Sequence, residues 1–140
     1  MGELMTYVFR ENAILPMDAV LALYEDAGWS AYTRNPEQLM RALEGSLLTV
    51  TAWQGESLVG LVRAVGDGET ILYIQDILVL KTHRRQAIGR SLLSRLLDQF
   101  EHVRQKVLLT DDTPETRGFY KAMGFAACDK GQQVAFARFD

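Results

Sequence analysis

The sequence predicts an α+β domain with a central, mostly antiparallel, twisted sheet of about six or seven strands, flanked by about four helices. Two observations support this fold class. The elements follow the order strand, two helices, three strands, helix, strand, helix and strands, and short turns join the three consecutive strands, as in an antiparallel meander. The 140 residues, 48% of them hydrophobic, suit one domain over residues 1–140 with its own core.

The N-terminal third is predicted to hold one strand and two helices. Residues 5–10 alternate weakly in hydrophobicity and contain aromatic and β-branched residues, which is typical of a strand. Pro16 is placed to begin a helix that ends at Gly28, and Asn35 is placed to cap a second helix. The segment between the two helices is expected to be a loop.

The remaining elements are predicted from period-two alternation, helical periodicity and turn residues. Residues 47–54 and 57–65 form a hairpin around Gly55-Glu56, and residues 70–80 form the longest strand. Beyond the helix that follows this strand, we expect a strand at residues 106–110, a helix at residues 114–123, and a closing hairpin made of residues 125–128 and 133–139.

The run from Ile77 to Leu93 carries the main functional signal. An apolar segment of strand length leads into a basic loop with small residues and then into an amphipathic helix. A phosphate group fits such a helix start, because the first-turn N–H groups lack partners and the helix dipole favours an anion. On these features alone, a plain strand-to-helix connection stays an alternative. The residues expected to bind the anion, mainly through their backbone, are Arg84, Arg85, Gln86, Ala87, Ile88, Gly89, Arg90 and Ser91.

Two segments resemble a known family. The run Arg84-Arg85-Gln86-Ala87-Ile88-Gly89 resembles motif A of the GCN5-related N-acetyltransferase (GNAT) superfamily, with Ala87 where the family mostly has glycine and Lys81 where proline is usual. The run from Gly118 to Phe125, which contains Phe119-Tyr120 and Gly124-Phe125, is similar to motif B. Both motifs occur in the expected order, so the resemblance implies the acetyltransferase fold over nearly the whole chain.

The resemblance implies acetyl-CoA as cosubstrate and no metal. The loop would hold the pyrophosphate, and the pantetheine would lie along the strand that ends at Val79. A backbone N–H near Leu78 or Val79 would then stabilise negative charge on the thioester oxygen. The resemblance also makes Tyr120 the general acid that protonates the coenzyme A sulfur, because a phenol with a pKa near ~10 keeps its proton at neutral pH. The alternative is that Tyr120 is an ordinary core aromatic.

The general base is left open by the sequence. Regular alternation is expected to place Tyr73 and Gln75 on one face of the strand and Asp76 on the other. The resemblance places a base on the face of Tyr73 and Gln75, yet neither residue is a good base at neutral pH. Asp76 is the only carboxylate on the strand, and a bulge would be needed to turn it to that face. Gln75 and Asp76 are therefore candidate catalytic residues, with a structural role for Asp76 as the alternative.

The acceptor site is expected around the loop between the first two helices. Trp29 and Tyr32 lie on this loop and Tyr73 is expected to face it. Such aromatics bind apolar or cationic groups, or they cover a core, and both readings stay open. We expect the acceptor to be a small-molecule primary amine, aromatic or aliphatic, that attacks directly in a ternary complex. A protein lysine or N-terminus is the second candidate, and a non-catalytic acyl-CoA sensor is the alternative from another class.

Composition limits the partners, the localisation and the cysteine chemistry that we expect for the protein. The net charge of −3 argues against nucleic-acid binding and modestly favours a cationic acceptor. The sequence lacks an apolar stretch of bilayer length and a signal-peptide pattern, so we expect a cytoplasmic protein without a membrane partner. Cys128 is the single cysteine, which rules out an internal disulfide framework and offers no metal cluster. Exposed sheet edges are compatible with a homodimer.

Overall fold

The computed structural model describes residues 6–140, which fall into two compact units. The first unit extends to Leu108, and the second covers Leu109–Asp140. The first strand was expected from Met5, which lies outside the described residues; the strand itself begins at Val8.

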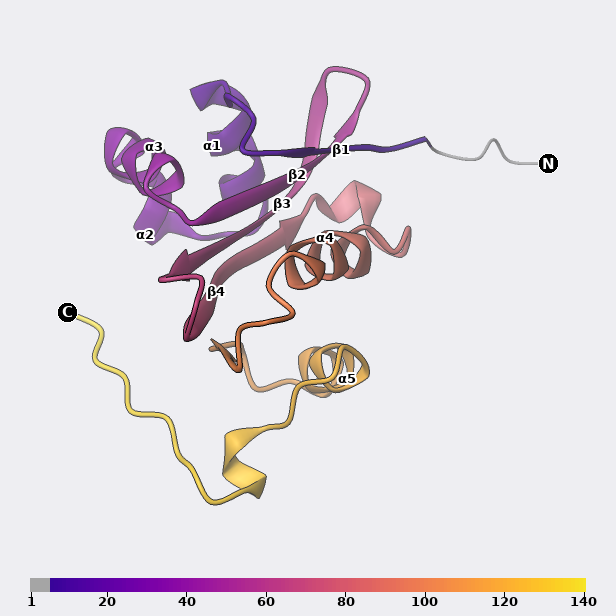
Figure 1. Ribbon diagram of the computed structural model, residues 1–140. Helices are drawn as coiled ribbons and strands as arrows, with labels where there is room; N and C mark the ends of the chain where they lie inside the picture. The colour runs from indigo at the N-terminus through magenta and orange to yellow at the C-terminus, as the bar shows by residue number, and fades with distance from the viewer. Residues whose placement is uncertain (1–5) are drawn as a thin grey trace. The chain divides into compact units, whose positions relative to one another are not determined.

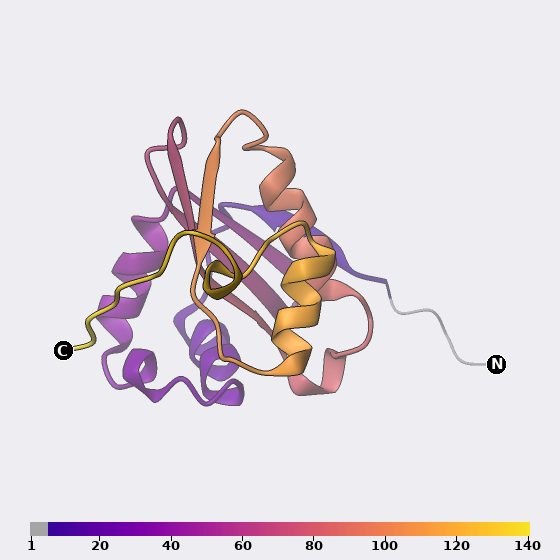
Figure 2. The ribbon, with the colours of Figure 1, turned by 90° about the horizontal axis from the view of Figure 1, so that it is seen from below.

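The first unit is built on a five-stranded sheet with the spatial order β1-β2-β3-β4-β5 (Figure 1). Strands β1 to β4 pair antiparallel, and β5 lies beside β4 in parallel orientation (Figure 2). This confirms the predicted α+β fold with a mostly antiparallel sheet flanked by helices, although the strands are fewer than the six or seven predicted. The strands are β1 (Val8–Glu11), β2 (Leu48–Gln54), β3 (Ser57–Gly66), β4 (Ile71–Val79) and β5 (Gln105–Leu108).

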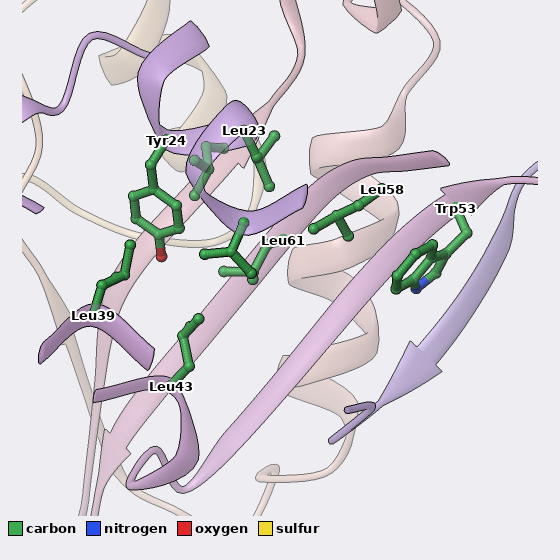
Figure 3. Close-up of a cluster of buried hydrophobic side chains, with 9 residues drawn as sticks. Leu23, Tyr24, Leu39, Leu43, Trp53, Leu58 and Leu61 are labelled. Atoms are coloured by element: carbon green, nitrogen blue, oxygen red, sulfur yellow. The ribbon is translucent and has the colours of Figure 1, made fainter. Parts of the chain in front are cut away.

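Helices cover both faces of this sheet (Figure 1). On one face, α1 and α3 bury Leu23, Tyr24, Leu39 and Leu43 against Leu61 of β3 and neighbouring side chains (Figure 3). Where a loop was expected after Gly28, the chain forms the one-turn helix α2. The predicted cap is present, since the Asn35 side chain accepts a hydrogen bond from Gln38 N at 3.2 Å. The helices are α1 (Met17–Asp26), α2 (Ser30–Thr33), α3 (Pro36–Glu44) and, on the other face, α4 (Ile88–Asp98).

Gly60 of β3 allows α4 to pack closely on the second face. A Cβ atom at this position would lie 3.1 Å from both Ile88 Cγ2 and Leu92 Cδ1, tighter than an ordinary contact. Because consecutive strand residues point to opposite faces, Gly60 faces α4 while Leu61 faces α1 and α3. The missing side chain therefore brings the first turn of α4 down onto the sheet.

A bulge interrupts the pairing of β3 with β4. Arg63 lies opposite Asp76 and the next residue, Ala64, lies opposite Ile74, so Gln75 is an extra residue on β4. The simple alternation that we expected for this strand is therefore wrong. Gln75 and Asp76 do not point to opposite faces, because both side chains hydrogen-bond to the same hydroxyl, that of Tyr32.

The second unit contains α5 (Pro114–Ala122), which matches the predicted helix. Thr113 caps it by accepting a hydrogen bond from Thr116 N at 3.1 Å. The predicted closing hairpin is wrong: residues 125–128 and 133–139 form no strand, and Cys128–Lys130 is a 3₁₀ turn. The apolar alternation there indicates only a propensity, and a strand also needs a neighbour that supplies its hydrogen bonds.

Candidate active site

Half of β4 has an unpaired edge. Strand β5 pairs with β4 only over Ile71–Ile74, so within the described chain Gln75–Val79 lacks a strand neighbour on that side. Leu80 N donates to Val59 O of β3 at 2.9 Å. Since backbone N–H groups point alternately to the two sides of a strand, the N–H of Val79 points toward the free edge and that of Leu78 toward β3. An extended polar chain can add to such an edge as a further strand.

The loop after β4 is held to the rest of the first unit by side chains. A 3₁₀ turn, Lys81–His83, follows the strand, and Asp26 at the end of α1 accepts a hydrogen bond from Lys81 N at 2.9 Å. The Tyr7 hydroxyl lies 2.9 Å from His83 Nδ1. The loop therefore starts from a fixed position next to the free edge of β4.

Among the described residues, several N–H groups at the start of α4 have no partner. Ala87 is the N-cap residue and adopts a left-handed conformation (φ 59°), and no side chain caps the helix. The first helical bond is donated by Ser91 N to Ala87 O at 3.0 Å. Within residues 6–140, the backbone N–H groups of Ile88, Gly89 and Arg90 therefore have no partner, which is the condition for the predicted anion site.

The residues near these N–H groups in the sequence include exposed basic side chains. Arg84, Arg85 and Arg90 are exposed, and within residues 6–140 none of them forms an ion pair. Gln86 is also exposed, whereas the Ile88 side chain is buried and belongs to the core. The loop thus combines unpaired positive charge with unpaired backbone donors, which suits a phosphate-bearing ligand.

A buried ion pair lies on the α1–α3 face of the sheet. Asp76 is 3% exposed, and Arg63 Nε contacts its Oδ2 at 2.5 Å. The hydroxyl of Tyr24 donates to Asp76 Oδ2 at 2.9 Å, and that of Tyr32 donates to Oδ1 at 2.8 Å. Both carboxylate oxygens are therefore occupied by the protein itself, an arrangement that fits the structural role left open for Asp76.

Burial and charge set the titration of this cluster. Burial, with the Asp76 charge and hydrogen bond added to it, raises the pKa of Tyr24 far above its ordinary value. Burial likewise raises the pKa of Tyr32. Burial alone would lower the pKa of Arg63, but the Asp76 carboxylate outweighs it and the net pKa is raised. The two phenols therefore keep their protons, and the arginine keeps its charge.

Of the predicted acceptor residues, Tyr32 belongs to this cluster and Trp29 lies beside it. The ring of Tyr32 contacts those of Trp29 and Tyr24, with centroids 6.1 and 5.2 Å apart. Gln75 Nε2 donates to the Tyr32 hydroxyl at 2.9 Å. Tyr73, also predicted for this site, is half-buried on β4.

Two residues of the site, Tyr24 and Arg63, were missed by the sequence analysis. Arg63 had a recognisable signal, because it interrupts the otherwise apolar strand from Leu58 to Val65 and a buried charge needs a partner. Tyr24 had no such signal, since its position on the apolar face of a helix also fits an ordinary core residue.

Tyr120 belongs to the second unit. Its ring packs against those of Phe119 and Phe125, with centroids 5.0 and 6.0 Å away. Burial raises the pKa of Tyr120, and a hydrogen bond with the Thr110 side chain acts in the opposite direction with a smaller effect. The phenol is therefore protonated at neutral pH, as a proton donor must be.

A free strand edge followed, after a short loop, by an uncapped helix start is the arrangement expected of a class of proteins that accept an extended, phosphate-bearing ligand. Comparison with known proteins identifies the family within this class. The family model described as an acetyltransferase (GNAT) domain matches residues 16–139. The chain therefore belongs to the GNAT acetyltransferase family, as the two sequence motifs predict.

Three known proteins illustrate this relationship. A GNAT family acetyltransferase from Streptococcus pneumoniae TIGR4 has a TM-score of 0.86 and 33% identity, covering 96% of this chain and 98% of its own. A Gibberella zeae protein with an acetyltransferase name is 29% identical over 129 residues, 75% of this chain and 71% of the relative. AAC(6′)-Iy, solved with a bisubstrate analogue of coenzyme A and acetylneamine, shares the fold with a TM-score of 0.67 at 16% identity, covering 96% of this chain and 99% of its own.

A helix that could cross a membrane is not found among residues 6–140.

Proposed function

We propose that the protein transfers the acetyl group of acetyl-CoA to the nitrogen of a primary amine, by direct attack within a ternary complex. The observation that carries this proposal is the free edge of β4, which the loop over residues 80–87 joins to the uncapped start of α4. These two features offer strand-like hydrogen bonds to a pantetheine arm and unpaired N–H groups to a pyrophosphate. AAC(6′)-Iy supports the choice of donor, because it shares the fold and holds a coenzyme A conjugate.

The residues of the loop and of the β4 edge have different roles in binding acetyl-CoA. The N–H groups of Ile88, Gly89 and Arg90 bind the pyrophosphate, and Arg84 and Arg85 add positive charge. Gln86 and Ser91 flank these donors in the sequence. The N–H of Val79 on the free edge of β4 stabilises the negative charge that develops on the thioester oxygen.

The reaction needs one nucleophile and two proton movements. The neutral amine forms the new N–C bond to the thioester carbonyl, and the tetrahedral intermediate then breaks the C–S bond. Tyr120 gives its proton to the leaving thiolate and regains one from solvent. The amine nitrogen loses its extra proton to solvent. The contacting rings of Trp29 and Tyr32, together with the predicted substrate residue Tyr73, favour a small aromatic or aliphatic amine as acceptor over a protein lysine or N-terminus.

A panel of amines tests this function. Release of coenzyme A thiol is measured with acetyl-CoA and aromatic amines, aliphatic amines or lysine-containing peptides, and acetylated products are verified by mass spectrometry. We expect turnover that depends on a small amine. Binding of acetyl-CoA without transfer to any acceptor would contradict the proposal and favour a non-catalytic acyl-CoA sensor.

A further inference from the structure

Gln75 occupies a special position on β4. It is the extra residue of the bulge, and it is exposed although its neighbours Ile74 and Asp76 are buried. It is also the first residue of β4 beyond the segment paired with β5, so it stands at the beginning of the free edge. The bulge therefore presents this side chain at the place where the acyl arm is proposed to lie.

The hydrogen bonds of the Tyr32 hydroxyl determine which end of the Gln75 side-chain amide faces Tyr32. The Asp76 carboxylate only accepts hydrogen bonds, so the Tyr32 hydroxyl must give its single proton to Asp76 Oδ1, 2.8 Å away. The Tyr32 oxygen can then act only as an acceptor toward Gln75, and the group that meets it at 2.9 Å must be the NH₂ of the amide. The carbonyl oxygen of Gln75 consequently points away from Tyr32.

This carbonyl oxygen is exposed and open to solvent or a ligand. Within residues 6–140 it has no hydrogen-bond partner, whereas both oxygens of Asp76 are occupied by Tyr24, Tyr32 and Arg63. The charge of Asp76 is also compensated by Arg63. At the start of the free edge of β4, the cluster therefore presents a neutral, oriented hydrogen-bond acceptor and not a carboxylate.

We propose that Gln75 orients the acceptor amine through its side-chain carbonyl oxygen, with Tyr32 and Asp76 as positioning residues. This inference rests on the proposed N-acetylation of a primary amine. A hydrogen bond from one amine N–H to the carbonyl leaves the nitrogen lone pair free to attack. A neutral acceptor also stabilises an ammonium ion less than a carboxylate would, so it favours the protonation state that reacts.

Substitutions of Gln75 separate this role from a purely structural one. Gln75→Met keeps the length of the side chain but removes both polar ends, and we expect kcat/KM for the amine to fall about ten- to a hundred-fold, the scale of one lost hydrogen bond in a reacting complex. The KM for acetyl-CoA should stay within about two-fold. Gln75→Glu keeps an acceptor oxygen but loses the donor to Tyr32, and it should retain clearly more activity than Gln75→Met.

Gln38→Met is the matched control, because Gln38 is an exposed glutamine on α3. It should leave both kinetic constants unchanged. If wild-type activity is present and Gln75→Met behaves like Gln38→Met, the role of Gln75 is overturned while the proposed function stands. At a pH above the pKa of the amine, where a carboxylate no longer holds it as an ammonium ion, equal losses for the Met and Glu variants would show that only the bond to Tyr32 matters and would also overturn it. A wild-type protein that acetylates no amine overturns both proposals.

Tyr32→Phe tests the positioning role. Without the hydroxyl the amide of Gln75 can rotate, so kcat/KM for the amine should fall, by less than in Gln75→Met. In the Gln75→Met background, Tyr32→Phe should add little, because the two residues act as a unit. Thermal unfolding of each variant identifies any general loss of folding. Full additivity in folded variants would overturn the positioning role of Tyr32.

Discussion

Two charged regions lie near the free half of β4: the buried cluster around Asp76 and the exposed loop that precedes α4. The charges of the first are paired within the protein, whereas those of the second are not. In the cluster of Asp76, Arg63, Tyr24 and Tyr32, both carboxylate oxygens have protein partners and the ion pair is buried. In the loop that precedes α4, exposed arginines and first-turn N–H groups have no such partners within residues 6–140. A group saturated by the protein supports structure, whereas an unsatisfied donor is free for a ligand.

This difference changes how the two regions should respond to substitution. Removing a member of the buried cluster leaves another group desolvated without its partner, so stability should fall. Removing a charge from the loop exposes nothing that was buried, so ligand affinity should fall while stability stays the same. Stability and ligand affinity should therefore change separately when residues of the two regions are substituted.

Asp76→Ala should cause the largest loss of stability. It leaves the Arg63 guanidinium buried without its counter-ion, and breaking a buried pair in this way typically costs about 3–5 kcal/mol. Chemical denaturation measures the change in the free energy of unfolding. Asp98→Ala, an exposed aspartate on α4, is the control and should change stability by less than about 0.5 kcal/mol. Similar effects of the two substitutions would contradict the supporting role of the cluster.

Tyr120→Phe should affect turnover and not donor binding. We expect kcat to fall roughly ten- to a thousand-fold while the affinity for acetyl-CoA is unchanged, because only the proton for the leaving thiolate is lost. Since burial raises the pKa of Tyr120 above its usual 10.0, the protonated form persists to high pH. The wild-type rate should therefore show no alkaline decline from this phenol below about pH 10. Steady-state kinetics across pH and acetyl-CoA titrations test both points, and an unchanged kcat in the variant would remove Tyr120 from the mechanism.

The order of elements and the loop before α4 could be predicted from the sequence, because they depend on local signals. Apolar periodicity defines the amphipathic helix, and the small residues Ala87 and Gly89 mark the turn that opens it. The orientation of Gln75 and Asp76 could not be predicted. It depends on a bulge in the pairing of β4 with β3, and strict alternation is the only rule that a single strand offers.

The predicted closing hairpin in the second unit is also wrong because strand pairing depends on residues far away in the sequence. Val134 and Phe136 alternate as in a strand, yet both side chains are exposed and the segment has no strand partner within the described residues. Whether such a segment becomes a strand depends on a neighbour far away in the sequence. The cluster around Asp76 has a similar origin, because its partners come from α1, α2 and β3.

Neutralising the loop should weaken acetyl-CoA binding without loss of stability. Changing Arg84, Arg85 and Arg90 together to glutamine should lower the affinity by roughly three- to a hundred-fold, since each exposed charge contact contributes about 0.2–1 kcal/mol. The effect should shrink in high salt, because exposed charges are screened. Isothermal titration at two salt concentrations measures it, with Arg104→Gln as an exposed control outside the loop. A lowered unfolding temperature in the triple variant would contradict the separation of the two regions.

Ala87→Gly should have the smallest effect and the opposite sign. Ala87 is held at φ 59°, a left-handed conformation that costs a residue with a Cβ roughly 1–2 kcal/mol and glycine nothing. Glycine also adds freedom to the unfolded chain, which costs about 0.4–1 kcal/mol, so a net stabilisation of up to about 1.5 kcal/mol is expected. Without the Cβ, the backbone beside the proposed pyrophosphate site is less crowded, and acetyl-CoA affinity should not fall.

Ala42→Gly provides the contrast for this prediction. Ala42 lies inside α3 in a right-handed helical conformation, where the same substitution should destabilise the protein by about 1 kcal/mol. Denaturation curves that move in opposite directions for the two variants would establish that the loop stores backbone strain at Ala87. If Ala87→Gly destabilises the protein as Ala42→Gly does, the left-handed conformation at the start of α4 is not a source of strain, and the loop is already at its most stable with alanine.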